Sequence, residues 1–460
     1  MIVDSTPLDF EIQRVMQSSV SPNFYSYTGQ FKIGSQTFDV IKITDIDEHA
    51  DYELAYGAVK MMRVVMLLGD YTTQIYPAKG NLEFILKTEL LNYTNYDKSD
   101  QPGSVTVETF NVSIDPKARP YMAEDNNSES LSREVQNLID FVEIDIQLKP
   151  KLLDDIAKVS VGGNYTNTTN ADVIKNAITM HCAELQLDDD EKLLGVNMHP
   201  SAATDKWPQV IIDHGVMLSD LADYVQKKTG GVFPTGMAQF VHDRIWYVYP
   251  PYDTAGFDDA KEKLIVISVP AKRYPQIEKT YLTQNGITTI LSTGNKKIQS
   301  DKSQIQDNAG NGVMFADANQ IVQGFSKDGN NTALVQRSKN NSEFVGEQAP
   351  NGKNNVRMSA ENITANPYLA TSRLARSQGH FYTVEWENAD PELIKPGLNV
   401  KIMFLNEGEV KEVNGVLLKA HIQTKMNGKG LLANGYRSFI AMVIFVRADD
   451  PNQAGLVGLD

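Results

Sequence analysis

Residues 216–253, VMLSDLADYVQKKTGGVFPTGMAQFVHDRIWYVYPPYD, combine two unlike periodicities and mark a change of structure in the middle of the chain. Over 218–225 the apolar residues recur at helical spacing, and a glycine pair follows as a stop signal. From Arg244 onward the side chains alternate with a period of two until a proline pair ends the pattern. The stretch therefore predicts a short amphipathic helix, a glycine turn and a strand.

Histidine and aromatic residues crowd the second half of this stretch. The candidate site residues are His242, Trp246, Tyr247, Tyr249 and Tyr252. The tyrosines, together with the tryptophans at 207, 246 and 386, could stack on a sugar. Aromatic alternation within a strand more often packs a core or a subunit interface. We therefore expect these residues to serve packing or an interface, at the joint between a small module and the β unit that follows.

The residues before 150 are rich in strand patterns. Short runs recur at hairpin spacing, and 141–148 alternates hydrophobic with polar residues. The run 59–68 is nearly all apolar and suits a strand or a helix. We favour a strand, because Gly69 and Asp70 end it and 71–76 is β-rich. The pattern indicates a barrel or a sandwich rather than a parallel α/β sheet.

Residues 151–275 change in character and read as an α+β module. A helix is expected over 171–183, where apolar residues share one face and Asn170 is placed to cap the N-terminus. The segment 188–208 is acidic and loop-like, and the helix and strand of 216–253 follow it.

A second all-β segment is expected over 276–447. Its later strand patterns surround turn signals at Pro396-Gly397 and Asn414-Gly415. Within it, 295–367 is rich in Asn, Gly, Ser, Gln and Lys and reads as a long polar insertion. We expect this insertion to become ordered only against partners. Residues 448–460 read as an extended C-terminal tail.

Length, charge and cysteine content narrow the function classes. At 460 residues the chain is long enough for roughly three domains. Its 43 Lys and Arg against 58 Asp and Glu give a net charge of −15, which argues against binding a phosphate backbone. The single cysteine, Cys182, excludes an internal disulfide. With neither a leader pattern nor a long apolar run, we expect a soluble chain made in the cytoplasm.

The residue types that most often bind metals or catalyse reactions are present, but they lack the spacing that such sites require. The histidines at 181, 199, 214 and 242 match no metal-ligand spacing. The run from Asp45 to Asp51 resembles the start of a calcium loop, but Ala50 stands in place of the turn glycine, so a solvated turn is expected. The acids from Asp188 to Glu191 lack a partner carboxylate across a cleft. No catalytic residue, cofactor or metal is therefore expected.

The order of these features resembles a known assembly family. A glycine-aspartate-tyrosine turn at 69–71 with Pro77, the α+β module, and a strand like RIWYVYPPYD resemble the central baseplate hub proteins of contractile-tailed bacteriophages. Type VI secretion spike proteins share that fold. The resemblance covers about residues 10–446 and implies two β-barrel domains of the tail-hub type, over 1–150 and 276–447. The insertion at 295–367 departs from the family pattern.

In that family, two similar barrels per subunit let a trimer match a six-fold tail tube to a three-fold spike. The resemblance therefore implies a non-enzymatic structural protein of the virion tail baseplate, assembled in the host cytoplasm. Its implied partners are further copies of itself, the tail tube protein, the central spike protein and other baseplate proteins, without nucleic acid or membrane insertion. Two alternatives stay open: a virion-associated enzyme that degrades cell wall or polysaccharide, and a six-fold tail tube or baseplate wedge component.

Overall fold

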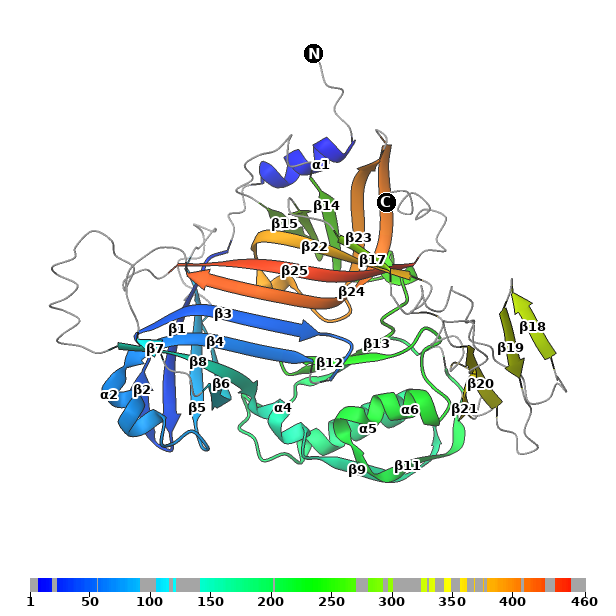
Figure 1. Ribbon diagram of the computed structural model, residues 1–460, viewed down its shortest axis with the longest axis horizontal. Helices are drawn as coiled ribbons and strands as arrows, with labels where there is room; N and C mark the ends of the chain where they lie inside the picture. The colour runs from blue at the N-terminus through cyan, green and yellow to red at the C-terminus, as the bar shows by residue number, and fades with distance from the viewer. Residues whose placement is uncertain are drawn as a thin grey trace, which may run out of the picture.

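Strands dominate the fold (Figure 1). The computed structural model describes residues 7–18, 23–55, 57–91, 105–115, 119–120, 141–201, 203–269, 280–292, 297–300, 324–328, 331–335, 343–348, 356–361, 368, 375, 379–406, 409–426 and 435–447. The largest sheet holds 16 strands, and helices gather in the middle third of the chain. The prediction of a mainly β chain with an α+β module is confirmed.

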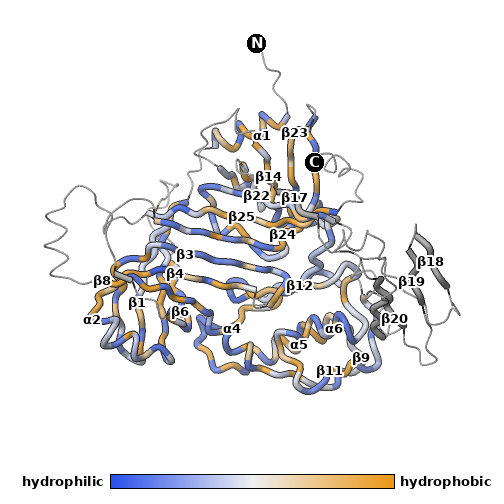
Figure 2. The backbone as a smooth tube through the Cα atoms, viewed as in Figure 1, coloured by the Kyte–Doolittle hydropathy of each residue, from blue (hydrophilic) through white to orange (hydrophobic). Residues whose placement is uncertain are grey.

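The strands before residue 150 form an antiparallel series. They are β1 (Tyr25–Ile33), β2 (Gln36–Asp39), β3 (Lys42–Asp51), β4 (Ala58–Leu67), β5 (Glu83–Leu90), β6 (Val105–Ile114), β7 (Arg119–Pro120) and β8 (Phe141–Pro150). Neighbours pair in the order β3-β4-β8-β6-β5-β1. The alternation predicted for β8 is confirmed, since Val142, Ile144, Ile146 and Leu148 are all buried. Hydrophobic and hydrophilic residues also alternate along the strands in Figure 2.

The C-terminal strands continue the same sheet. They are β14 (Lys263–Ser268), β15 (Tyr281–Gln284), β16 (Ile287–Ser292), β17 (Lys297–Ser300), β22 (Gly379–Ala389), β23 (Asn399–Asn406), β24 (Glu409–Met426) and β25 (Tyr436–Arg447). β14 runs parallel to both β16 and β23, while β22, β24 and β25 pair antiparallel. The predicted strands after residue 380 are therefore confirmed.

The two ends of the chain meet in this sheet. β24 pairs with β3 from Lys419 opposite Asp51 to Lys425 opposite Asp45. β25 reaches β1, where Tyr436 lies opposite Tyr25, and the Tyr436 hydroxyl donates to the Ile43 carbonyl at 2.6 Å. The pairings thus lead from β3 through β4, β8, β6, β5 and β1 to β25, and through β24 back to β3.

The middle of the chain forms a separate layer against this sheet (Figure 1). Its elements are α4 (Lys151–Ile156), β9 (Ser160–Thr168), α5 (Asn170–Ala183), β10 (Gly195–Met198), β11 (Trp207–Met217), η2 (Leu218–Asp220), α6 (Leu221–Lys228), β12 (Ala238–His242) and β13 (Ile245–Tyr249). The predicted helix over 171–183, the helix within 216–228 and the strand before Pro250 are all confirmed.

Each of these three parts of the structure packs around a hydrophobic core. One lies under the N-terminal strands and includes Phe31, Phe84 and, from β25, Tyr436. A second lies under the C-terminal strands and includes Trp386. The third fills the module, between α5, α6 and the strands beside them. A smaller cluster holds α1 (Pro7–Met16) against β14 and β16.

Four local predictions are wrong. Residues 68–75 are helical, in α2 (Leu68–Asp70) and η1 (Tyr71–Ile75), because Tyr71 and Ile75 lie four apart and bury the same side of the turn. Asn414 and Gly415 lie inside β24, where a side chain at 415 would meet the Phe445 carbonyl oxygen at 2.5 Å. The acidic segment 188–208 contains β10, which lies parallel to β13. The expected turn from Asp45 to Asp51 lies within β3.

The cap of α5 is also not the predicted one. Thr169 precedes the helix, and its hydroxyl accepts from the Asp172 amide at 3.1 Å. Asn170 is buried instead, and its amide group donates to the carbonyls of Thr229 and Gly231, both at 2.9 Å. It therefore ties α5 to the end of α6.

The predicted insertion contains strands that its composition does not signal. These are β17, β18 (Gly324–Asp328), β19 (Asn331–Val335), β20 (Glu343–Gln348) and β21 (Val356–Glu361), of which β18 pairs with β19 and β20 with β21. The rest of 295–367, apart from these strands, and the predicted tail 448–460 lie outside the described residues. Among the described helices, none has the length and hydrophobicity needed to cross a membrane.

Candidate functional site

The β12–β13 hairpin carries most of the predicted site residues. The two strands pair antiparallel from Ala238 opposite Tyr249 to His242 opposite Ile245. The turn residues Asp243 and Arg244 have φ of 48° and 61°, both in the left-handed region. Two consecutive residues of this kind form the tight hairpin turn whose twist matches paired strands. The conformation of the hairpin is therefore determined by its turn as well as by its apolar residues.

The two faces of the hairpin belong to different cores. Val241, Trp246 and Val248 pack in the core of the module. Phe240 and Tyr249 face the other way and join the core under the C-terminal strands. Successive residues of a strand point to opposite sides, so the alternation at 244–249 gives the hairpin two apolar faces. The hairpin therefore lies as a layer between two hydrophobic cores.

Trp246 is the most enclosed of the predicted residues. Its side chain is fully buried, and its Nε1 donates to Gln239 Oε1 at 3.2 Å. Gln239 in turn donates to the Ser219 carbonyl at the start of the helical segment. Trp386 is also fully buried, so neither ring has a face free to stack on a sugar. The tryptophan at 246 therefore serves the packing of the module.

Tyr249 and Tyr252 connect the hairpin to the end of β3. The Tyr249 hydroxyl donates to the Tyr52 carbonyl at 2.8 Å, and burial raises the pKa of Tyr249 well above its ordinary value. Tyr252 donates to a carboxylate oxygen of Glu53. Tyr252 also lies edge-on to Phe445 of β25, with ring centroids 4.9 Å apart. These contacts tie the module, the N-terminal strands and the C-terminal strands together.

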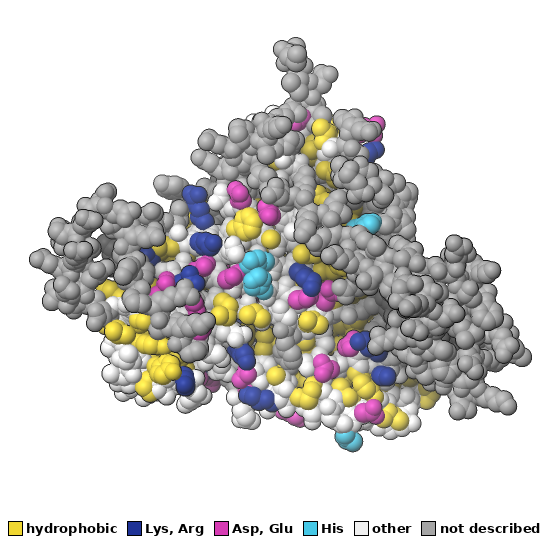
Figure 3. Space-filling model, viewed as in Figure 1, with side chains coloured by type: hydrophobic (Ala, Val, Ile, Leu, Met, Phe, Trp, Pro, Cys, Tyr) yellow, Lys and Arg dark blue, Asp and Glu magenta, His cyan; other side chains and the backbone are white. Residues whose placement is uncertain are grey.

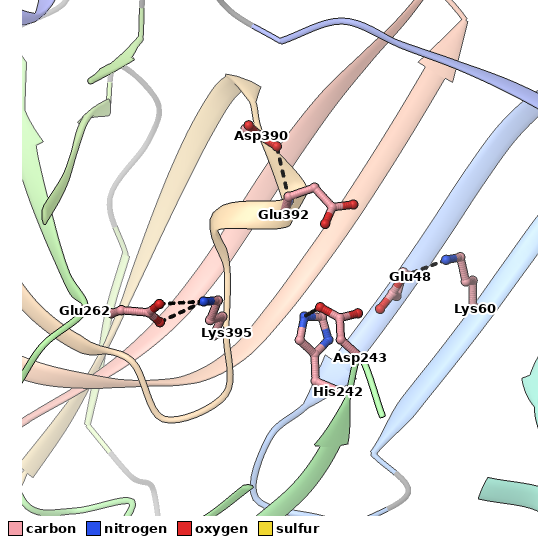
Figure 4. Close-up of polar contacts among 8 residues, drawn as sticks. All are labelled: Glu48, Lys60, His242, Asp243, Glu262, Asp390, Glu392 and Lys395. Carbon is pink, nitrogen blue, oxygen red and sulfur yellow. Dashed lines mark hydrogen bonds and ion pairs between the residues drawn. The ribbon is translucent and has the colours of Figure 1, made fainter. Parts of the chain in front are cut away.

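His242 lies at the centre of a charged cluster (Figure 4). Its Nε2 is 3.1 Å from Asp243 Oδ2, and its side chain is 23% exposed. Burial alone would lower the pKa of His242, but the hydrogen bond and charge of Asp243, with Glu48 and Glu392, outweigh burial and raise it. Burial, together with Asp243 and Asp390, raises the pKa of Glu392.

The other charges of the cluster join different parts of the chain. Lys60 of β4 lies 3.5 Å from Glu48 of β3, and Lys395 lies 2.7 Å from Glu262. Asp390 accepts from the Asn23 side chain at 2.7 Å and from the Tyr25 hydroxyl at 2.9 Å. The cluster therefore lies where the N-terminal strands, the hairpin and the loop after β22 meet.

We expect the His242–Asp243 pair to make stability depend on pH. A histidine whose folded-state pKa is raised stabilises the fold at pH values below about 6.5, and this contribution is lost as pH rises through the raised pKa. Chemical unfolding at about pH 6, 7 and 8 should therefore show the wild type losing more stability with rising pH than His242→Gln does. The difference should stay under about 1 kcal/mol, because the Asp243 side chain is 62% exposed.

Asp243→Asn is the matched control for this prediction, because it removes the carboxylate and keeps the ring. It should flatten the same part of the pH curve. Parallel curves for the wild type and His242→Gln between about pH 6 and 8 would contradict the assignment.

The cysteine shows no sign of activation. Cys182 is buried within α5, and burial raises the pKa of its thiol to about 12. A thiolate nucleophile needs a lowered pKa. Its position is that of a small core side chain, as the sequence indicated.

Sequence reasoning missed a second group of side chains. Among the described residues, Asp47, His49 and His421 form the one group with the geometry of metal ligands, and their potential ligand atoms lie within 4.8 Å of one another. The three belong to β3 and β24, so no local spacing signals them. The predicted residues lie elsewhere, on or just after the hairpin: His242, Trp246, Tyr247, Tyr249 and Tyr252. Tyr247 of β13 is partly buried and packs against the core under the C-terminal strands. Whether any of the five contacts another subunit stays a prediction.

Comparison with solved structures finds tail proteins with a general likeness of fold. No protein-family model matches the chain, and no curated protein matches it in sequence. The 43 kDa tail protein of prophage MuSo2 from Shewanella oneidensis is 9% identical, with a TM-score of 0.42 over 91% of this chain and 98% of that one. The tail protein from Neisseria meningitidis is 10% identical, with a TM-score of 0.41 over 94% and 99%.

A component of the E. coli type VI secretion system, described as similar to T4 bacteriophage tail proteins, is 8% identical with a TM-score of 0.36, over 92% of this chain and 77% of that one. These are the classes of protein that the sequence resembles. Such low identities and TM-scores describe a general likeness of fold, and they carry no conclusion about partners or assembly.

Proposed function

We propose that this chain is a structural protein of a phage tail baseplate, and that three copies form the hub between the six-fold tail tube and the three-fold spike. The observation that carries the proposal is the presence of two β units in one chain. The N-terminal strands pack mainly around one core, which contains Phe84, and the C-terminal strands pack mainly around another, which contains Trp386. Three such chains offer six β units, which suits a junction between three-fold and six-fold symmetry.

Together with this function we propose that the chain is divided into three consecutive domains. It comprises a first β-barrel over 1–150, an α+β module over 151–275 and a second β-barrel over 276–447. β24 and β25 pair with strands of both β units. This sharing favours a rigid subunit, because the long strand β24 (Glu409–Met426) spans the junction without a hinge.

Exposed apolar side chains support self-association or binding of another tail protein. Leu91, Val105 and Val107 lie at one end of the β5–β6 pair and are 43%, 44% and 57% exposed. Val105 pairs with Glu89 and Val107 with Lys87, so the three apolar residues share one face of the ribbon with these two charged side chains. A group of this kind is typical of contact surfaces.

The proposed partners are the tail tube protein, the central spike protein and other baseplate proteins, and the proposed location is the virion tail, after assembly in the host cytoplasm. The enzyme alternative would require turnover of cell wall or polysaccharide by the purified chain. The tube or wedge alternative would require a six-membered ring.

The number of copies in the assembly of the purified chain tests the proposal. A trimer supports the hub, a hexamer supports the tube or wedge alternative, and a chain that stays monomeric at all concentrations contradicts both.

A further inference from the structure

We propose that Asp47, His49 and His421 bind a divalent transition-metal ion of the zinc class, which joins β3 to β24. The potential ligand atoms of the three side chains lie within 4.8 Å of one another. Asp47 and His49 come from β3, and His421 comes from β24. In Figure 3 a patch of histidine side chains lies near the middle of the visible face, among acidic and basic side chains.

The register of the two strands puts these side chains together. His421 lies opposite His49, and Gln423 lies opposite Asp47. Residues two apart in a strand share a face, so all four side chains project from the same side of the sheet. The two imidazole rings stack with centroids 3.8 Å apart and planes 16° apart.

The Nε2 atoms of both histidines lie near one carboxylate oxygen. Asp47 Oδ1 lies 2.5 Å from His421 Nε2 and 3.6 Å from His49 Nε2. Three donor atoms this close together can surround a small cation once the carboxylate moves back by about 1 Å and the two rings turn out of their stack. The rings must turn because zinc lies in the plane of each imidazole that binds it, about 2.0–2.2 Å from nitrogen and oxygen ligands.

The donor set selects the kind of ion. Two imidazoles and one carboxylate, completed by a fourth ligand, are a usual zinc arrangement. Calcium and magnesium prefer several oxygen ligands, and this cluster offers a single carboxylate. Gln423, whose amide nitrogen is placed 3.3 Å from His421 Nε2, is the nearest candidate for the fourth ligand, because its amide oxygen and nitrogen can exchange places.

The flanking charges do not compete for the cluster. Lys419 pairs with Asp51 at 2.5 Å on one side, and Lys425 lies opposite Asp45 on the other. Each lysine beside the cluster therefore faces an acid of its own. The side chains of His421 and His49 are 30% and 57% exposed, so an ion can enter from solvent without any opening of the fold.

Binding of this ion would join segments that are far apart in the chain. An unfolded chain does not hold His49 near His421, so the ion binds the folded state and raises its stability. The ion would fasten the pairing of β3 with β24, which connects the N-terminal and C-terminal strands.

The test is titration of the full chain with zinc chloride by calorimetry after removal of metals with a chelator, at about pH 7.5, because protons compete with zinc for its ligands at lower pH. We expect one zinc ion per chain, no comparable binding of calcium or magnesium, and a higher unfolding temperature in zinc than in chelator. His49→Gln and His421→Gln should each weaken zinc binding by more than about tenfold. His181→Gln is the matched control, since His181 has a carboxylate neighbour, Glu184, at 3.7 Å and lies outside the cluster.

Three results would overturn the proposal. The first is that the wild type binds no zinc, and the second is that both cluster variants bind zinc as tightly as the wild type does. The third is that His181→Gln weakens zinc binding as much as the cluster variants do. If a cluster variant fails to fold, the wild-type titration with zinc and calcium decides by itself. The hub proposal does not enter this test, so a monomeric chain that binds zinc at this cluster would still support the metal site.

Discussion

Replacing Trp246 by alanine is expected to lower the free energy of unfolding by about 3–5 kcal/mol. The side chain is fully buried in the core of the module, and its Nε1 donates to Gln239 at 3.2 Å. Removal of the ring leaves a cavity and a buried amide oxygen without that donor. Domains are commonly stable by only 5–15 kcal/mol, so the module should unfold at a clearly lower denaturant concentration.

Two controls separate burial from a general intolerance of substitution at tryptophan. Trp207 lies at the edge of the same core and is only partly buried, so Trp207→Ala should cost less. Trp246→Phe keeps most of the apolar contact and should fall between the wild type and Trp246→Ala. If Trp246→Ala unfolds at the wild-type denaturant concentration and has lost the binding of a ligand, the packing assignment is wrong and the hairpin is a binding site.

Residues 1–150 produced alone are expected not to fold cooperatively. The strand β3 would lose its whole pairing with β24, and the N-terminal core would lose Tyr436 and its hydrogen bond to Ile43. An unpaired edge and an open core favour aggregation over a native fold. Thermal unfolding followed by circular dichroism should therefore show a broad transition or none.

The fragment 151–253 is the comparison for this experiment. The buried residues of its core come from within the fragment, with Ala55 as the exception. It should keep its helices and unfold in a single transition, although the face of Phe240 and Tyr249 becomes exposed. A sharp, reversible transition of the fragment 1–150 at the temperature of the full chain would show that the N-terminal β unit folds by itself.

Local periodicity predicted much of the fold. The alternation in β8, the helical face of α5 and the change of period at 216–253 each depend on neighbours in sequence, and each is confirmed. The helical turn at 68–75 was missed because its β-forming side chains are overruled by the burial of Tyr71 and Ile75 on one side.

Long-range pairing is what the sequence could not predict. Nothing near residue 47 indicates that β3 will pair with a strand beyond residue 409, so neither the joining of the two β units nor the meeting of His49 with His421 could be foreseen. In the same way, the alternation at 244–249 showed two faces but not which cores would cover them. The hairpin's position between two cores required the coordinates.

The mass of the purified full chain, measured over a wide range of concentrations, distinguishes the trimeric hub from a monomer and from a six-membered ring. We expect a trimer that persists on dilution and forms no larger ring. A persistent monomer or a closed hexamer at every concentration would contradict the hub.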